Sequence, residues 1–379
     1  MVGVEAGPEA RPPRPLVLVP ATLGRYIAGR TLAAVLLVML AFAVLGFLID
    51  LVEHLRDAVE EGRPLWEAAQ LTLLRLPSLV DRIWPFGVLF GGMFAFWRLN
   101  RSRELVAVRA GGVSAWQFLA PAALVAALLG GVVVTSLNPL GAALAARYER
   151  LEDRRDAGGA PRLTVFPGGL WLKQERGGGT VLLHAERLRA TPPVALSPVT
   201  VFLYDAAGDY RARIDAPRAV LSTAAWVLED AQRSDEEGLG RPIGAWRLPT
   251  DLDAATITRS ARDPTTLSVW ELPGYIAVVE ELGFSARAHR VHFQGLLATP
   301  LLFAAMLLVG VTFTLRFART GLAGMLPAGL AAGFLLFVLV DVVHALGVSG
   351  QLPAALAAWT PTAVALMLAG GALFQLEDG

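Results

Sequence analysis

Cysteine is absent from this sequence of 379 residues, and lysine occurs once, at Lys173. The lack of cysteine excludes disulfides, thiolate metal sites and thiol nucleophiles. The one lysine lies in Trp-Leu-Lys-Gln, outside any Walker A pattern, so we expect no ATP hydrolysis by this chain. A His-Glu-x-x-His motif, a Ser/His/Asp array and cofactor motifs are also missing. The formal net charge of zero gives no sign of nucleic-acid binding.

Charged residues are scarce as well. They make up 17% of the chain, whereas soluble domains have about a quarter. Hydrophobic residues reach 54%, and the mean hydropathy is +0.52. This composition is typical of a membrane protein.

Six apolar runs are long enough to cross a hydrocarbon core of about 30 Å. They are Thr31–Ile49, a run that ends at Trp97, Ala115–Leu137, Phe293–Leu315, Gly321–Leu346 and Leu352–Phe374. The first continues into the polar residues 50–57, which predicts a helix that projects beyond the bilayer. Pro77 and Pro85 predict kinks in the second. Six spans, three on each side of a long insert, place both termini on one side.

Arginine distribution predicts which side this is. Ten arginines fall in the N-terminal tail, the 98–114 loop and the 316–320 turn: Arg11, Arg14, Arg25, Arg30, Arg98, Arg101, Arg103, Arg109, Arg316 and Arg319. The two short loops on the opposite side contain only Arg56 and Arg63 among several acidic residues. We therefore expect cytoplasmic termini and an insert, roughly 141–285, on the opposite side of the membrane.

The insert has a different pattern. Short strand-like runs alternate with Gly, Pro and Asp turns, at 162–166, 169–173, 180–184, 199–204, 210–214, 218–222, 225–229, 244–248 and 255–258. This predicts an all-β domain of sandwich or jellyroll type. Ser268 and Glu271 form a capping-box pattern, which indicates a helix over 269–283 that leads into the fourth span.

We therefore divide the chain into four parts. Residues 1–20 are a disordered cytoplasmic tail, and 21–140 hold spans one to three. Residues 141–268 form the β domain, of sandwich or jellyroll type, and 269–379 hold the connecting helix and spans four to six.

A short helix over 102–112 is predicted between spans two and three. Ser102 is a suitable N-cap, Glu104 lies where the helix dipole favours an anion, and Gly111 with Gly112 provides a left-handed stop. Ser114 and Gln117 form a capping box that starts the third span. Such a helix is either a plain solvated loop or a part that pushes against a partner.

Several polar and glycine positions allow two interpretations. The Gly87-x-x-x-Gly91 and Gly329-x-x-x-Gly333 patterns are either close helix contacts or chance matches in a glycine-rich chain. His289 and His292 are either metal ligands or interfacial residues. Asp341 and His344, late in span five, are either a functional site within the membrane or residues at its outer interface.

These features together resemble the LptF/LptG permease family of the lipopolysaccharide exporter. The resemblance covers about residues 22–379. It is carried by Arg25-Tyr-Ile27, the 102–114 stretch Ser-Arg-Glu-Leu-Val-Ala-Val-Arg-Ala-Gly-Gly-Val-Ser, Gly169-Leu-Trp-Leu-Lys173 and Pro353 to Pro361. Gly169–Lys173 and the His-Leu-Arg-Asp end of span one resemble the LptG branch more than the LptF branch.

The resemblance implies a permease subunit that extracts lipopolysaccharide and passes it to a periplasmic bridge. The implied partners are LptF as heterodimer, an LptB ATPase dimer, LptC, and LptA through the jellyroll. No cofactor is implied in this chain, since the partner ATPase uses ATP. The ATPase would contact the 102–112 helix, with these residues at the coupling surface: Ser102, Arg103, Glu104, Leu105, Arg109 and Gly111.

Two further sets of residues are predicted to act in export. Arg56, Arg147 and Arg150 are expected at the outer leaflet of the inner membrane. Arginine there either binds lipid phosphates or only extends its charged end toward the interface. Gly329 and Gly333 lie on one face of span five and would form a seam with the second subunit. Two other functional classes stay open: a scaffold with a periplasmic β-domain, and a membrane enzyme that acts on lipids.

Overall fold

A computed structural model describes residues 21–155, 162–166, 169–176, 179–189, 193–222, 224–235, 240–250, 263–281, 285–316 and 322–378. Within these ranges, six helices are long and apolar enough to cross a membrane. They are built from α1 (Ala21–Glu60), α2 (Leu65–Arg101), the α4–η1–α5 unit (Ala115–Val132, Val133–Leu137 and Asn138–Arg155), α8 (Arg287–Arg316), α9 (Leu322–Val348) and α10 (Ala354–Asp378). The six predicted spans are confirmed. The predicted tail over 1–20 lies outside the described residues.

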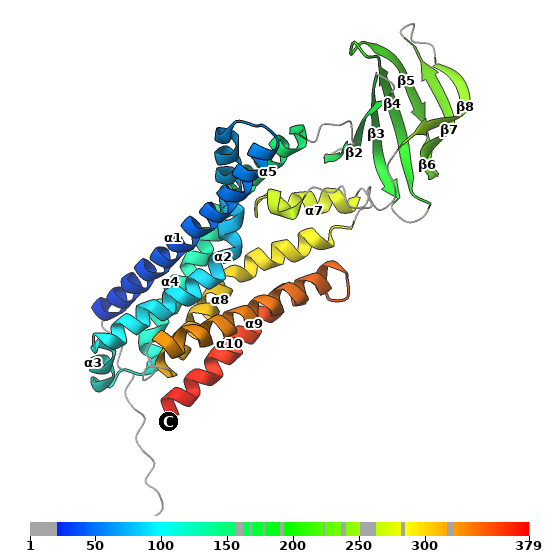
Figure 1. Cartoon of the computed structure of the whole chain (residues 1–379). Coiled ribbons are helices and arrows are strands. Elements are labelled where there is room, and N and C mark those ends of the chain that lie inside the picture. Colours follow the sequence, from blue (N-terminus) through cyan, green and yellow to red (C-terminus); the bar gives the residue numbers. More distant parts are fainter. Residues whose placement is uncertain are drawn as a thin grey trace, which may run out of the picture.

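The helices form an elongated bundle, and the β-sheet lies beyond one end of it (Figure 1). The short helix α3 (Glu104–Ala110) lies at the opposite end. A further helix, α7 (Leu272–Glu281), lies between the sheet and the bundle, and its Val279 belongs to the apolar cluster of the sheet. The β-sheet and α3 are therefore at opposite ends of the molecule.

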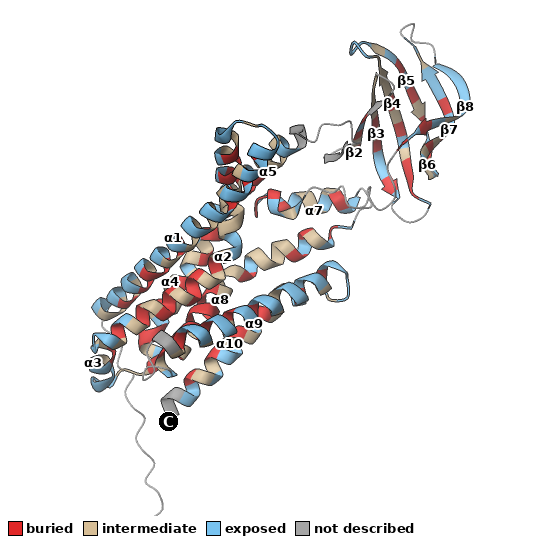
Figure 2. Ribbon diagram, viewed as in Figure 1, coloured by how far each residue is buried: buried red, intermediate tan, exposed pale blue. Residues whose placement is uncertain are grey.

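Burial is strongest on the inner faces of the bundle (Figure 2). In the most apolar 18-residue stretch of α8, 56% of the residues are buried, whereas the corresponding share is 17% in α1 and 22% in α9. The outer face of α1 exposes large apolar side chains such as Leu37, Leu40 and Val44. Helices that are apolar on their exposed faces fit a lipid environment.

Glycines allow close contact between α1 and α2. A Cβ atom at Gly91 would lie 2.4 Å from Val35 Cα, and one at Gly87 would lie 1.9 Å from Met39 Sδ. The Gly87-x-x-x-Gly91 pattern is therefore a true helix contact inside the chain.

The insert forms one antiparallel sheet in chain order. Its strands are β1 (Arg162–Phe166), β2 (Gly169–Arg176), β3 (Gly179–Arg189), β4 (Ala195–Tyr204), β5 (Tyr210–Ala216), β6 (Arg218–Ser222), β7 (Ala225–Ser234) and β8 (Gly240–Pro249). Both β5 and β6 pair with β4 on one side and β7 on the other. They are one strand interrupted at Pro217, which cannot donate to the ladder. The predicted all-β insert is confirmed, and the predicted strand at 255–258 lies outside the described residues.

The segment that returns from the sheet is fastened to the third span. Pro139 has no N–H, so the carbonyl of Thr135 lacks its helical donor, and a π-helical turn occurs there. The indole Nε1 of Trp270 donates to that carbonyl at 3.3 Å, and the buried backbone N–H of Val269 donates to Asn138 Oδ1 at 2.8 Å. The Asn138–Pro139 pair thus forms a socket for Val269 and Trp270.

Candidate functional site

The α3 end of the bundle contains the predicted coupling helix. Leu105 is 5% exposed and belongs to the core of the bundle, with Val108 packed against that core. Val106 is 59% exposed on the other face. Arg109 lies with its guanidinium 6.0 Å from the centre of the Phe118 ring. The helix is therefore fixed to the bundle by one face and presents the other for contact.

The predicted N-cap is wrong. Helix α2 continues to Arg101, and the Ser102 hydroxyl lies 3.1 Å from the Arg98 carbonyl and 3.2 Å from the Leu99 carbonyl. Ser102 thus satisfies the end of α2 instead of the start of α3. Arg103 occupies the N-cap position with a left-handed φ of 59°, and it makes no side-chain capping bond.

The other end of α3 follows the prediction. Gly112 has a φ of 82° and provides the left-handed stop, whereas Gly111 has a φ of −74°. The capping box of Ser114 and Gln117 is also confirmed, with bonds of 3.3 and 2.9 Å. The helix is shorter than predicted, Glu104–Ala110 in place of 102–112.

Glu104 connects α3 to the first span. The hydroxyl of Tyr26 donates a hydrogen bond of 2.9 Å to its Oε2 atom. Hydrogen bonds from Ser102 and Tyr26, together with the nearby charges of Arg30 and Arg98, lower the pKa of Glu104 from its ordinary 4.5. Glu104 is therefore a carboxylate at neutral pH, surrounded by arginines.

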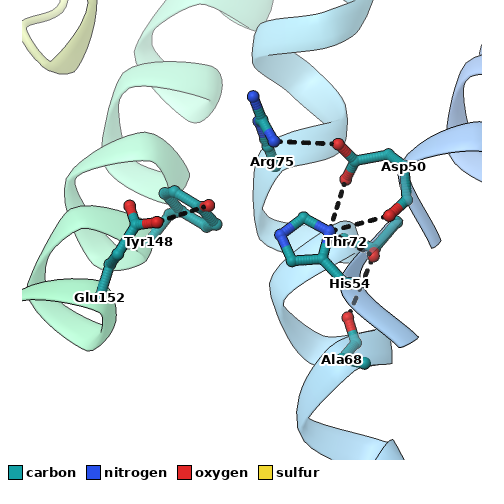
Figure 3. A network of polar contacts seen from close by, with 7 residues as sticks. All are labelled: Asp50, His54, Ala68, Thr72, Arg75, Tyr148 and Glu152. Carbon is teal, nitrogen blue, oxygen red and sulfur yellow. Dashed lines mark hydrogen bonds and ion pairs between the residues drawn. The ribbon is translucent and has the colours of Figure 1, made fainter. Parts of the chain in front are cut away.

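A second polar site lies at the opposite end of the bundle (Figure 3). Asp50 of α1 is buried, and its Oδ1 accepts a 3.1 Å bond from Arg75 of α2. His54 Nδ1 lies 2.9 Å from the Asp50 carbonyl oxygen and 3.2 Å from Asp50 Oδ2. Tyr148 of α5 faces both His54 and Arg75, with its ring centre 6.3 Å from that of His54 and 6.0 Å from the Arg75 Cζ. Sequence reasoning missed this network, although Asp50 and His54 share one helix face directly after an apolar run.

The glycine seam predicted on span five is wrong. A Cβ atom at Gly329 would lie 2.5 Å from Met93 Sδ, and one at Gly333 would lie 2.8 Å from Leu89 Cδ2. Met93 and Leu89 belong to α2 of the same chain. The two glycines are therefore occupied by an internal helix contact and cannot face a second subunit.

The comparisons with known proteins agree with this architecture. A model of the family described as "Lipopolysaccharide export system permease LptF/LptG" matches residues 25–375. The chain belongs to the LptF/LptG family. The match includes the spans, α3 and the β insert alike.

Curated relatives of the LptF/LptG family match over nearly their full length. The lipopolysaccharide export system permease protein LptG of Haemophilus influenzae is 23% identical over 364 residues, which is 94% of this chain and 99% of the relative. The protein of the same name from Escherichia coli K12 is 23% identical over 356 residues, 90% of this chain and 94% of the relative. The chain is thus similar to LptG proteins over nearly its whole length.

The three arginines predicted to bind lipid phosphates are all exposed. Arg56 forms an ion pair of 2.9 Å with Glu60 on α1. Arg147 and Arg150 lie on α5, and Arg150 Nε donates to the Ala146 carbonyl at 3.1 Å. They lie at the same end of the bundle as the Asp50–Arg75 network, and their lipid contacts stay a prediction.

Metal binding finds no support in the described part of the chain. No group of three or more His, Cys, Asp or Glu side chains is placed there to hold an ion. His289 is 2% exposed, and its ring lies 5.0 Å from that of Tyr275, so it is a packed residue of α8. Asp341 and His344 are exposed on α9, as expected for interfacial positions.

Proposed function

We propose that this chain is the LptG-type membrane subunit of a lipopolysaccharide exporter that a separate ATPase drives. The observation that carries the proposal is the family match across residues 25–375, which includes the α3 region and the β insert. The named relatives are permease proteins of lipopolysaccharide export systems. In this proposal the partners are LptF as heterodimer, two LptB subunits, LptC, and LptA beyond the sheet.

The arginine distribution supports an orientation in the inner membrane. Arg25, Arg30, Arg98 and Arg109 all lie at the α3 end of the bundle. The opposite end has the acidic hairpin tip between α1 and α2. By the positive-inside rule, α3 and the termini face the cytoplasm and the sheet faces the periplasm.

The geometry of α3 supports an ATPase contact. A single buried residue, Leu105, anchors α3, while Val106 and the Glu104 carboxylate stay accessible. The rest of the α3 end is rich in arginine, so Glu104 is a distinct acidic feature on a basic surface. We propose that Glu104 meets a basic residue in a groove of the ATPase and that α3 transmits its motion to α1 through Tyr26.

Energetics explain why export needs such a drive. Each acyl CH₂ removed from a bilayer costs about 0.8 kcal/mol, so one 14-carbon chain costs roughly 10 kcal/mol. Lipid A has several chains, and spontaneous release would be very slow. The proposed extraction therefore requires a cavity that encloses the acyl chains and closes on them, and the β-domain would be the next apolar surface to receive them.

Co-purification tests the proposal. The affinity-tagged chain is extracted from its native membrane in mild detergent, and bound proteins are identified by mass spectrometry, with an unrelated six-span protein as control. We expect one copy of a second permease chain and two copies of an ATPase subunit for each copy of the tagged chain. Recovery of periplasmic proteins alone, without an ATPase, would support a membrane-anchored scaffold instead.

A further inference from the structure

Arg75 has more hydrogen-bonding capacity than its contacts use. Its side chain is 43% exposed, while the Asp50 side chain that it contacts is 6% exposed. Within the described residues, its one hydrogen bond runs from Nη1 to Asp50 Oδ1. A guanidinium has five N–H donors in a fixed plane. The edge formed by Nε and Nη2 therefore remains as a two-donor fork.

The neighbours of Asp50 hold it in one position. His54 Nδ1 approaches three oxygens: the Asp50 carbonyl, Asp50 Oδ2 and Thr72 Oγ1, the last at 3.3 Å. Thr72 donates its own proton to the Ala68 carbonyl at 3.0 Å, so it accepts from His54. A proton on Nδ1 of His54 fits this arrangement, because the Asp50 carbonyl and Thr72 Oγ1 both act as acceptors. His54, held in turn by Thr72, thus supports the residue that positions Arg75 (Figure 3).

Tyr148, on a third helix, faces the guanidinium of Arg75 and restricts its position. Its ring lies 6.0 Å from the Arg75 Cζ, and its hydroxyl donates to Glu152 at 3.1 Å. Arg75 is therefore placed by residues of α1, α2 and α5 together. Such support by several neighbours is what holds a binding group within a narrow geometry.

The depth of Arg75 matches that of lipid headgroups. Asp50 follows directly after the apolar run Thr31–Ile49, and α1 continues ten residues further to Glu60, about 15 Å. Arg75 likewise lies ten residues from the start of α2 at Leu65. Asp50, and Arg75 through its bond to Asp50, thus lie at the level where the apolar run of α1 ends. The phosphates of a lipid leaflet lie at the same level, at the edge of the hydrocarbon core.

We propose that Arg75 binds a phosphate group of the lipid A headgroup, and that Asp50 is its positioning residue. Arginine binds phosphate through two parallel N–H bonds, and the free edge of Arg75 offers this geometry. Asp50 offsets the positive charge of Arg75, and Glu152 lies nearby, so the attraction for phosphate rests on the two directed N–H bonds and not on a net positive charge. The phosphate chemistry follows from the site, whereas the choice of lipid A rests on the proposed function.

A purely structural role would also use the Asp50–Arg75 pair, as a staple between α1 and α2. The two roles differ in their response to paired substitutions. The double variant Asp50→Asn/Arg75→Gln removes both charges and leaves neither unpaired. A purely structural pair would then lose little stability, because the cost of a broken pair comes mainly from the charge left alone. Phosphate binding would still be lost in that double variant.

Binding is measured with the full complex in nanodiscs, with bisphosphoryl lipid A and dephosphorylated lipid A as probes. We expect the wild type to prefer the bisphosphoryl probe, and Arg75→Gln and the double variant to lose roughly tenfold or more of that preference. Arg75→Lys, which keeps the charge without the fork, should retain part of it. Arg290→Gln is the matched control, since Arg290 is 55% exposed in an ion pair with Glu280 on α7 and α8.

Each outcome decides the matter. An unchanged preference in Arg75→Gln with normal assembly would overturn the proposal. A double variant that assembles and binds the bisphosphoryl probe like the wild type would also overturn it, since the Asp50–Arg75 pair would then have only a structural role between α1 and α2. If the wild type binds neither probe, the proposed function fails and not the phosphate site, which phosphatidylglycerol phosphate as a third probe would then test.

Discussion

The hydroxyl of Tyr26 on α1 donates a 2.9 Å hydrogen bond to the carboxylate of Glu104 on α3. These residues are 78 positions apart, and their contact joins the short helix to the first membrane span. Leu105 fixes α3 to the bundle core, but Tyr26 is the side chain that links the accessible carboxylate to α1. A push on α3 therefore has a direct route to the span that is least buried in the bundle.

Acid should release this link. The pKa of Glu104 is lowered from 4.5. The charged carboxylate therefore stabilises the contact with Tyr26 above that pH, and this stabilisation is lost as the pH falls through the folded-state pKa. In Tyr26→Phe one donor is missing, and the loss should begin at higher pH. The affinity of the ATPase for the solubilised chain, titrated from pH 7 to pH 4, measures this shift. Tyr148→Phe, at the far end, should titrate like the wild type.

Arg103→Gly should stabilise the chain. Arg103 has a φ of 59°, which costs a residue with a Cβ about 1–2 kcal/mol and costs glycine nothing. Arg98→Gly, in the regular part of α2, should destabilise by about 1 kcal/mol. Thermal unfolding in detergent compares the two. If both variants lose stability to the same extent, the left-handed turn between α2 and α3 is not strained.

Gly130 and Gly131 are adjacent in α4, yet alanine should affect them differently. A Cβ atom at Gly130 would lie 2.7 Å from Pro300 Cα of α8, whereas at Gly131 nothing lies within 4 Å. Gly130→Ala should cost about 1–3 kcal/mol through overpacking. Gly131→Ala should be neutral or stabilise by about 1 kcal/mol. Unfolding midpoints of the two variants that coincide would contradict the close contact of α4 and α8.

The same reasoning changes the expectation for span five. Leucine at Gly329 and Gly333 should force α9 away from Met93 and Leu89 of α2 and destabilise the isolated chain. A seam with another subunit would instead leave the isolated chain intact. Thermal unfolding of the chain without partners distinguishes the two interpretations. Full stability of the double leucine variant would support a seam with another subunit.

Asn138→Leu should loosen the return segment of the sheet. The variant removes the acceptor of the buried Val269 N–H, which costs about 1–3 kcal/mol. Hydrogen exchange at residues 264–272 should speed up while the core of α8 stays protected. Ser136→Ala, at an exposed position two residues earlier, is the control and should leave exchange unchanged.

Local patterns in the sequence predicted the elements well. Apolar run length located the spans, and turn residues gave the ends of β1 and β6 at Arg162–Phe166 and Arg218–Ser222 as the structure has them. The Ser114 capping box was recognisable because both partners lie within one turn. Such features depend only on near neighbours in the chain.

Features that depend on packing could not be predicted. Asp50 and Arg75 are 25 positions apart, and nothing in either local pattern pairs them. The residue type of Ser102 suits an N-cap of α3 as well as the C-terminal end of α2, and only the length of α2 decides between the two roles. The Gly329 pattern indicated a helix contact correctly but could not show that the partner helix belongs to the same chain.

The central claim is that this chain exports lipopolysaccharide through a contact at Glu104. Proteoliposomes with the permease pair, the ATPase and lipopolysaccharide test it most directly, with transfer to a soluble periplasmic acceptor as the readout. The wild type should show transfer that needs ATP, and Glu104→Arg should abolish or uncouple it, while Glu281→Arg, at an exposed position at the end of α7, should transfer normally. Absence of ATP-dependent transfer by the wild type, or normal transfer by Glu104→Arg, would contradict the account.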